Sequence, residues 1–139
     1  MKNTTYLFLA VLLICAGCPD QDFGSNREFT ITNKTDTRLV SMLAFRIVTD
    51  TLLQNSNPYP TSEQLELNTI NSQSSMTFVD AFDETFEQQS DKILMLYLFS
   101  RDTIEQVSWD QIVDEYLVLR RYDLTLEDLE AMDWTVEYP

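Results

Sequence analysis

Cys18 is the residue whose chemistry this sequence specifies most clearly. It follows two small residues, Ala16 and Gly17, and an apolar run over 6–14 that comes after a single basic residue, Lys2. A short basic start, an apolar stretch too short to span a bilayer and small residues before a cut site are typical of a cleaved export signal. The pattern predicts cleavage before Cys18 and acylation of its thiol. Ordinary cleavage that leaves Cys18 as a free thiol is the alternative.

Acylation of Cys18 predicts a stable membrane anchor. A modified cysteine of this kind carries two or more acyl chains, palmitate among them, and two chains hold a protein on a bilayer where one does not. Cys15, which stands where leucine is usual in such signals, leaves with the signal peptide. No disulfide is then expected, so the fold must be held by its apolar core.

The composition argues against an enzyme. The chain has no histidine, which removes the usual general base near neutral pH and the Ser-His-Asp and Cys-His arrangements. Serine–lysine catalysis would need Lys34 or Lys92 buried beside a serine, and both are predicted in polar turns or at strand starts. A carboxylate pair for glycoside hydrolysis can be chosen among 23 acidic residues in many ways, so the acidic count predicts none. We expect no enzymatic activity and no cofactor, with a cryptic hydrolase as the alternative.

One acidic segment offers hard oxygen ligands that suit calcium. It contains Asp80, Asp83, Glu84 and Glu87. The spacing differs from the calcium-binding EF-hand loop because it lacks the alternating Asp-x-Asp-x-Asp and the glycine of the sharp turn. Zinc and copper are excluded without histidine or a free cysteine. The segment is predicted to be a solvated acidic loop without a metal, and a calcium site is the alternative.

Ligand binding would rest on exposed aromatic side chains, because a sugar ring presents an apolar face to them. Tyr59 lies between Pro58 and Pro60 in a polar loop, with Asn55 and Asn57 nearby as polar partners. These residues are the candidate ligand-binding group, and packing of Tyr59 against the rim of the domain is the alternative. Four other aromatic residues are expected in the core: Trp109, Tyr122, Trp134 and Tyr138.

Arg120 and Arg121 stand out in so acidic a chain. They could bind a carboxylate or an acidic sugar. A structural ion pair from Arg121 to Asp123 or Asp128 is the favoured prediction, because it would tie the last strands to the C-terminal helix.

Charge and length limit the partners and the number of domains. Removing residues 1–17 leaves 122 residues with 8 basic and 23 acidic side chains, a net charge of −15. Such a surface repels phosphates and anionic headgroups, so no nucleic-acid partner is expected. We predict three parts: a signal peptide over 1–17, a lipidated flexible tether over 18–27 and one domain over 28–139, which is enough chain for one core.

The pattern of apolar residues predicts a mainly β fold. Alternation or short apolar runs predict strands over 29–32, 39–48, 65–69, 76–79, 93–99, 117–123 and 134–138. The strands over 65–69 and 76–79 are expected to form a hairpin. Short helices are predicted over 109–115, capped by Ser108, and from Thr125, with Asp128 in a capping box, together with one helical turn at 82–86. The predicted class is a single small β-sandwich of about seven strands with one or two short helices near the C-terminus.

Four C-terminal stretches carry a resemblance to a family. They read FSRDTIE over 99–105, WDQI over 109–112, RYDLTLEDL over 121–129 and WTVEYP over 134–139. Together with the signal ending at Cys18, they resemble small lipoproteins common in Bacteroidetes. The resemblance covers about the last 40 residues and the signal; it implies residence on a Gram-negative outer membrane and no particular activity. Acidic residues just after the cysteine resemble the export bias for the cell surface in that phylum, although the proline at position 19 departs from it.

We therefore expect a lipid-anchored protein of the outer membrane, on its periplasmic face or at the cell surface. Its predicted function is that of a non-enzymatic interaction or binding module whose partners are envelope proteins or glycans. The alternative is a glycan-binding accessory protein of a surface polysaccharide-uptake system.

Overall fold

The computed structural model describes residues 27–46, 61–80, 82–87 and 92–139. Within them the fold is mainly β, with seven strands in two sheets and five short helices, and this β-sandwich-like arrangement confirms the predicted class. The strands are β1 (Arg27–Asn33), β2 (Leu39–Arg46), β3 (Thr69–Ile70), β4 (Ser74–Asp80), β5 (Ile93–Ser100), β6 (Arg120–Leu124) and β7 (Thr135–Tyr138). The helices are α3 (Ser62–Leu67), α4 (Phe82–Glu87), α5 (Arg101–Gln106), α6 (Trp109–Asp114) and α7 (Leu126–Ala131).

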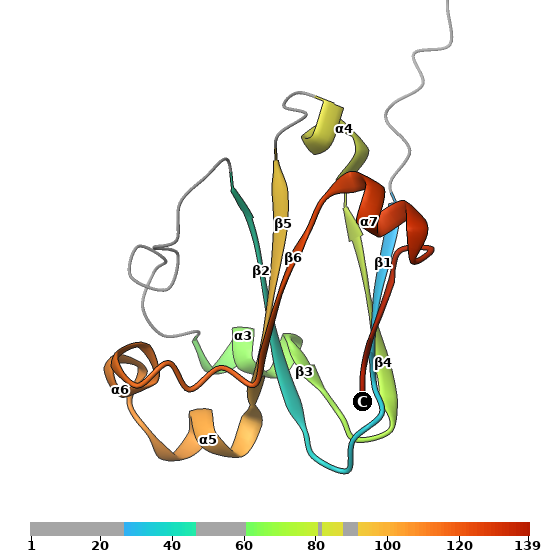
Figure 1. The fold of residues 1–139 in the computed structure, drawn as a ribbon. Helices are drawn as coiled ribbons and strands as arrows, with labels where there is room; N and C mark the ends of the chain where they lie inside the picture. Colours follow the sequence, from blue (N-terminus) through green and yellow to red (C-terminus); the bar gives the residue numbers. More distant parts are fainter. Residues whose placement is uncertain (1–26, 47–60, 81, 88–91) are drawn as a thin grey trace, which may run out of the picture.

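The two sheets differ in their pairing. Sheet A has the order β4-β1-β7, in which β1 is antiparallel to β4 and parallel to β7. Sheet B has the order β3-β2-β5-β6 and is antiparallel throughout. The chain crosses from one sheet to the other after β1 and again after β3, at the lower end of the molecule in Figure 1. Helix α7 makes the crossing from β6 to β7 at the opposite end.

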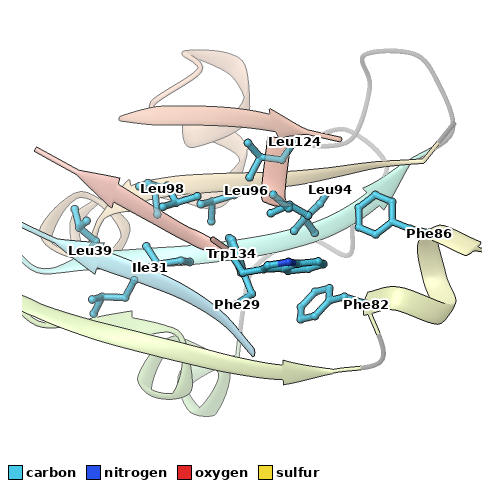
Figure 2. Packing of buried hydrophobic residues seen from close by; sticks show 13 residues of the cluster. Phe29, Ile31, Leu39, Phe82, Phe86, Leu94, Leu96, Leu98, Leu124 and Trp134 are labelled. Atoms are coloured by element: carbon cyan, nitrogen blue, oxygen red, sulfur yellow. The ribbon is translucent and has the colours of Figure 1, made fainter. Parts of the chain in front are cut away.

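The main core lies between the two sheets (Figure 2). Phe29 and Ile31 are fully buried and alternate with threonines that face outward, which is the period-two pattern of a strand covered on one face. Sheet B supplies the facing residues, while Phe82 and Phe86 of α4 close one end. The helical turn predicted at 82–86 is therefore confirmed, and its two phenylalanines belong to the core.

A second core lies on the other face of sheet B, under helices α3, α5 and α6. Strand β5 contributes to both cores: Leu94, Leu96 and Leu98 pack between the sheets, and Met95, Tyr97 and Phe99 pack under the helices. Coverage on both faces explains the uninterrupted apolar run predicted as a buried strand over 93–99. Strand β2, predicted over 39–48, alternates between the two cores in the same way.

Asn33 ties the two sheets together at the crossover end. Its side chain is fully buried at the end of β1. Its Nδ2 donates to the carbonyl oxygens of Thr37 at 2.7 Å and of Asn71 at 2.9 Å, and its Oδ1 accepts from the amide and hydroxyl of Thr35. One amide side chain thus holds the β1–β2 turn and the end of β3 in a single arrangement.

Arg101 is a second buried polar anchor. Its side chain is 9% exposed and forms ion pairs with Glu66 and Glu105 at 2.9 and 2.7 Å. Its Nη1 donates to the carbonyl oxygen of Leu65 and to the hydroxyl of Thr69. The hydrogen bond to Glu105 raises the pKa of the guanidinium, against the effect of burial. These contacts fasten α3 to α5 and to the edge of sheet B.

The structure corrects the predictions for 65–69 and its hairpin. Residues 62–67 form α3, because Thr61 and Gln64 make a reciprocal capping box that starts a helix. Only Thr69–Ile70 is a strand in this region. It pairs with β2 in sheet B, whereas β4 pairs with β1 in sheet A, so the two strands do not form a hairpin. Helix α5 was not predicted.

The two C-terminal helices follow their predicted caps. The Ser108 side chain accepts from the amide of Gln111 at the start of α6. At α7 the side chains of Thr125 and Asp128 each accept from the other's backbone amide, forming the predicted capping box. The amide and the hydroxyl of Thr125 both donate to the Asp128 carboxylate, and these two hydrogen bonds lower the pKa of Asp128.

We expect Asn33→Ala to lower the free energy of unfolding by about 2 kcal/mol, since it removes both donors and leaves buried carbonyl and amide groups without partners. Urea unfolding measures the change. Asn71→Ala is the matched control, because Asn71 takes part in this network through its backbone carbonyl; its stability should stay close to that of the wild type. Equal stability of the two variants would contradict the role given to Asn33.

Candidate functional site

The four residues predicted to carry chemistry or binding lie outside the described part of the chain. These are Cys18, Asn55, Asn57 and Tyr59. The predictions of lipidation at Cys18 and of a ligand-binding loop around Tyr59 therefore stay predictions.

The acidic segment and the lysine candidate are partly described. In the residues that the structure covers, no group of three or more metal-ligating side chains comes together. The side chains of Asp83 and Glu87 lie outside the description, so the prediction for this loop is not tested. Lys34 has a half-exposed side chain and forms an ion pair with Glu137. Lys34 therefore lacks the burial that a lysine base requires, and Lys92, directly before β5, is only partly buried.

The aromatic residues expected in the core do pack there. Trp109 and Trp134 are 4% and 6% exposed. Tyr122 and Tyr138 are partly buried and pack against the core between the sheets. These four side chains are thus structural, as predicted, although Tyr122 also reaches the molecular surface.

The outer edge of β6 is the candidate site that the structure reveals. Strand β6 is the last strand of sheet B, and among the described residues no strand pairs with its outer side. Figure 1 shows β6 next to β5 in one sheet and β7 next to β1 in the other. We refer to residues Arg120–Leu124 and this unpaired side as the β6 edge. An edge strand presents backbone donors and acceptors that another strand can use.

Arg121 is held on the helix-covered side of sheet B. Its Nε and Nη2 donate to the two carboxylate oxygens of Asp123 at 2.6 and 2.9 Å. Its guanidinium lies over the ring of Tyr97, 5.5 Å from the centroid, and contacts the sulfur of Met95. The predicted ion pair to Asp123 is confirmed. It lies within β6 and does not reach helix α7, because the Asp128 carboxylate caps that helix.

Arg120 has no carboxylate partner in the described part of the chain, whereas Arg38, Arg101 and Arg121 each pair with at least one. Its guanidinium lies over the ring of Tyr122, 4.9 Å from the centroid. The side chain is exposed and lies in a strongly acidic protein. Its N–H groups are thus available to a partner, and the aromatic ring beneath fixes its position.

Tyr122 closes the side of the sandwich where both sheets end. Its hydroxyl donates to the backbone carbonyl of Glu137 in β7 at 3.3 Å. Burial raises the pKa of Tyr122; the charge of Arg120 acts against this shift and Tyr138 adds to it. The residue therefore joins β6 to β7 where no strand hydrogen bonds link the two sheets.

The β6 edge suits the recognition of another strand. It combines an unpaired strand side with two arginines, one carboxylate and one tyrosine, so a partner strand would meet both backbone hydrogen bonds and a fixed charge pattern. Sequence reasoning noticed the two arginines but not that their strand lies at an edge. Two consecutive arginines in a strand of an acidic chain were the available signal, because charged residues are common at sheet edges.

Comparison with known proteins gives no match: no protein-family model, curated protein or solved structure resembles this chain significantly. Among the described residues, no helix is both long and apolar enough to cross a membrane.

We expect Tyr122→Phe to lower the free energy of unfolding at neutral pH by about 1 kcal/mol, the usual contribution of one hydrogen bond. Because the folded-state pKa of Tyr122 is raised, its protonated form is favoured by folding, and this contribution is lost as the pH rises through that pKa. The difference between wild type and variant should therefore shrink well above pH 10. Urea unfolding at both pH values tests this.

The control is Tyr116→Phe, which removes the hydroxyl of an exposed tyrosine. It should leave stability unchanged at neutral pH. A difference between wild type and Tyr122→Phe that persists unaltered at high pH would contradict the assignment.

Proposed function

We propose that this protein is a lipid-anchored, non-enzymatic interaction module of the cell envelope that presents the β6 edge to a partner. The observation that carries the proposal is the unpaired edge strand with Arg120 free of any carboxylate in the described residues. The export signal ending at Cys18 supports the membrane location. No family match supplies a function, so the proposal rests on this geometry and on the sequence.

The position of β1 supports a tether at one end of the domain. Strand β1 begins at Arg27, at the end of the sandwich where α4 and α7 lie (Figure 1). Nine peptide units separate Cys18 from Arg27, so an acylated Cys18 would hold this end within about 30 Å of the bilayer. The β6 edge runs along the side of the domain and stays open to neighbouring proteins.

The use of polar side chains elsewhere also favours an interaction role. On the outer face of sheet A, the hydroxyls of Thr30 and Thr77 bond to each other at 3.0 Å. Buried Asn33 and Arg101 use their polar groups to fasten turns and helices. These side chains serve the fold, whereas the β6 edge presents backbone groups and the guanidinium of Arg120 to a partner.

Membrane attachment depends on Cys18 in this proposal. We expect Cys18→Ser to move the protein from the membrane fraction to the soluble fraction of expressing cells, with Cys15→Ser as the matched control that stays membrane-bound. Fractionation and immunoblotting of a tagged chain measure this. Membrane retention of Cys18→Ser would overturn the lipid anchor. Protease treatment of intact cells then separates surface display, where the wild type is cleaved, from a periplasmic location, where it is protected.

The β6 edge can be tested with a photoreactive amino acid at Leu119, which directly precedes β6 and is 45% exposed. Irradiation of intact cells should give crosslinked products from this position. Leu67 on α3 is the control, since it is 68% exposed but lies away from the edge. Equal crosslinking at both positions, or none at Leu119, would count against the β6 edge as the contact surface.

A further inference from the structure

We infer that the partner of the β6 edge is the β6 strand of a second copy of this chain, paired antiparallel about Tyr122. This inference rests on the interaction role proposed above. The β6 sequence is Arg-Arg-Tyr-Asp-Leu. When the strand is reversed about its central tyrosine, Arg121 of each copy lies opposite Asp123 of the other. Opposite charges directly across an antiparallel pair are stabilising, and like charges are destabilising.

The charged groups keep capacity for this second contact. Within one copy, Arg121 uses its Nε and Nη2 donors on Asp123. A carboxylate has about four acceptor positions, so Asp123 can accept from the arginine of the second copy as well as from its own Arg121. Pairing of two β6 edges would therefore place two arginines and two aspartates in an alternating ring on the helix-covered side of sheet B.

The other side of the strand is also compatible with pairing. Tyr122 lies opposite Tyr122 of the second copy at the twofold axis, and Arg120 lies opposite Leu124. Arg120, already stacked on its own tyrosine, becomes a diagonal neighbour of Tyr122 in the second copy, a position within reach of long side chains. Arg120, which has no carboxylate partner among the described residues, thus gains a second aromatic contact.

The net positive charge of β6 reduces the repulsion between two acidic chains at this edge. The mature protein has a net charge of −15 and eight basic residues, of which two lie in β6. The five residues of β6 carry two positive charges and one negative, so the edge is the basic strip of an acidic molecule. A strand of another sequence that sets a cation against Arg121 or a carboxylate against Asp123 is repelled, so the pairing favours this chain's own sequence.

The lipid anchors are compatible with this arrangement. Antiparallel pairing in a continuous sheet places the twofold axis perpendicular to it, so the two β1 strands begin at opposite ends of the dimer. The length of the domain along its strands is about that of β5, which has eight residues and spans about 27 Å. The segment from Cys18 to Arg27 can reach at least as far. Both copies can then attach to one bilayer with their strands lying along its surface.

Charge reversal tests this register directly. Two full-length copies with different C-terminal tags are co-expressed, solubilised in detergent and purified through one tag, and recovery of the other tag is measured. In Arg121→Asp, an aspartate at position 121 of each copy faces Asp123 of the other. In Asp123→Arg, an arginine at position 123 of each copy faces Arg121 of the other. Both variants therefore place like charges opposite each other at both cross-strand positions. We expect each variant alone to associate about tenfold less than the wild type.

The two variants should associate with each other. When Arg121→Asp in one copy is combined with Asp123→Arg in the other, every cross-strand position faces an opposite charge, and recovery should return to the wild-type level. The double variant carrying both changes in one chain should also self-associate. A general folding defect would not be cured by mixing two defective chains, and thermal melting of each variant checks folding separately.

The outcomes separate this inference from the proposed function. Failure of wild-type copies to co-purify, or failure of the mixed pair to recover, overturns self-pairing. If the photoreactive residue at position 119 then crosslinks to other proteins, the interaction module stands and its partner is not a second copy. If it gives neither self-crosslinks nor any others, both proposals fail.

Discussion

The fold depends on the buried side chain of Asn33. It lies where the chain leaves sheet A for sheet B, and its amide group also holds the carbonyl of Asn71, where the chain returns to sheet A. A fully satisfied buried polar network of this kind specifies one arrangement of the elements it joins. With this end fixed and α7 crossing at the other, the relative position of β6 and β7 is set, and the hydroxyl of Tyr122 can bridge them.

Sheet B is covered on both faces, so its edges are the natural places for contact with other chains. Sheet A covers one face, and α3, α5 and α6 cover the other. Of the two edges, β3 has only two residues, and Arg101 and its partners hold the adjoining helices against it. Strand β6 is longer and has no such cover in the described residues. The helices α3, α5 and α6 cover the face of sheet B but not its β6 edge. The β6 edge is therefore the accessible edge of this sheet.

Much of the fold could be predicted from the sequence, since β1, β2, β4, β5 and β7 follow clear apolar patterns. The segment 62–67 could not, because Leu65 and Leu67 alternate as in a strand while the Thr61–Gln64 capping box starts a helix. The strands β3 and β4 pair with β2 and β1 in different sheets, and no local pattern reveals these long-range pairings. The sequence shows the charged residues of the candidate site. It does not show that their strand lies at an edge, because an edge position depends on the order of all the strands in the sheet.

Scarcity of glycine constrains the turns next to β6. The chain has two glycines, and neither lies in the described residues. Left-handed backbone, which favours glycine, is therefore taken by Tyr116 at φ 50° after α6 and by Asp133 and Trp134 at φ 50° and 53° after α7. Such conformations cost about 1–2 kcal/mol each and persist where packing demands them. For Trp134 the burial of its ring against Phe82 offsets that cost. The strained turn before β7 is thus held by the packing of Trp134 against the core.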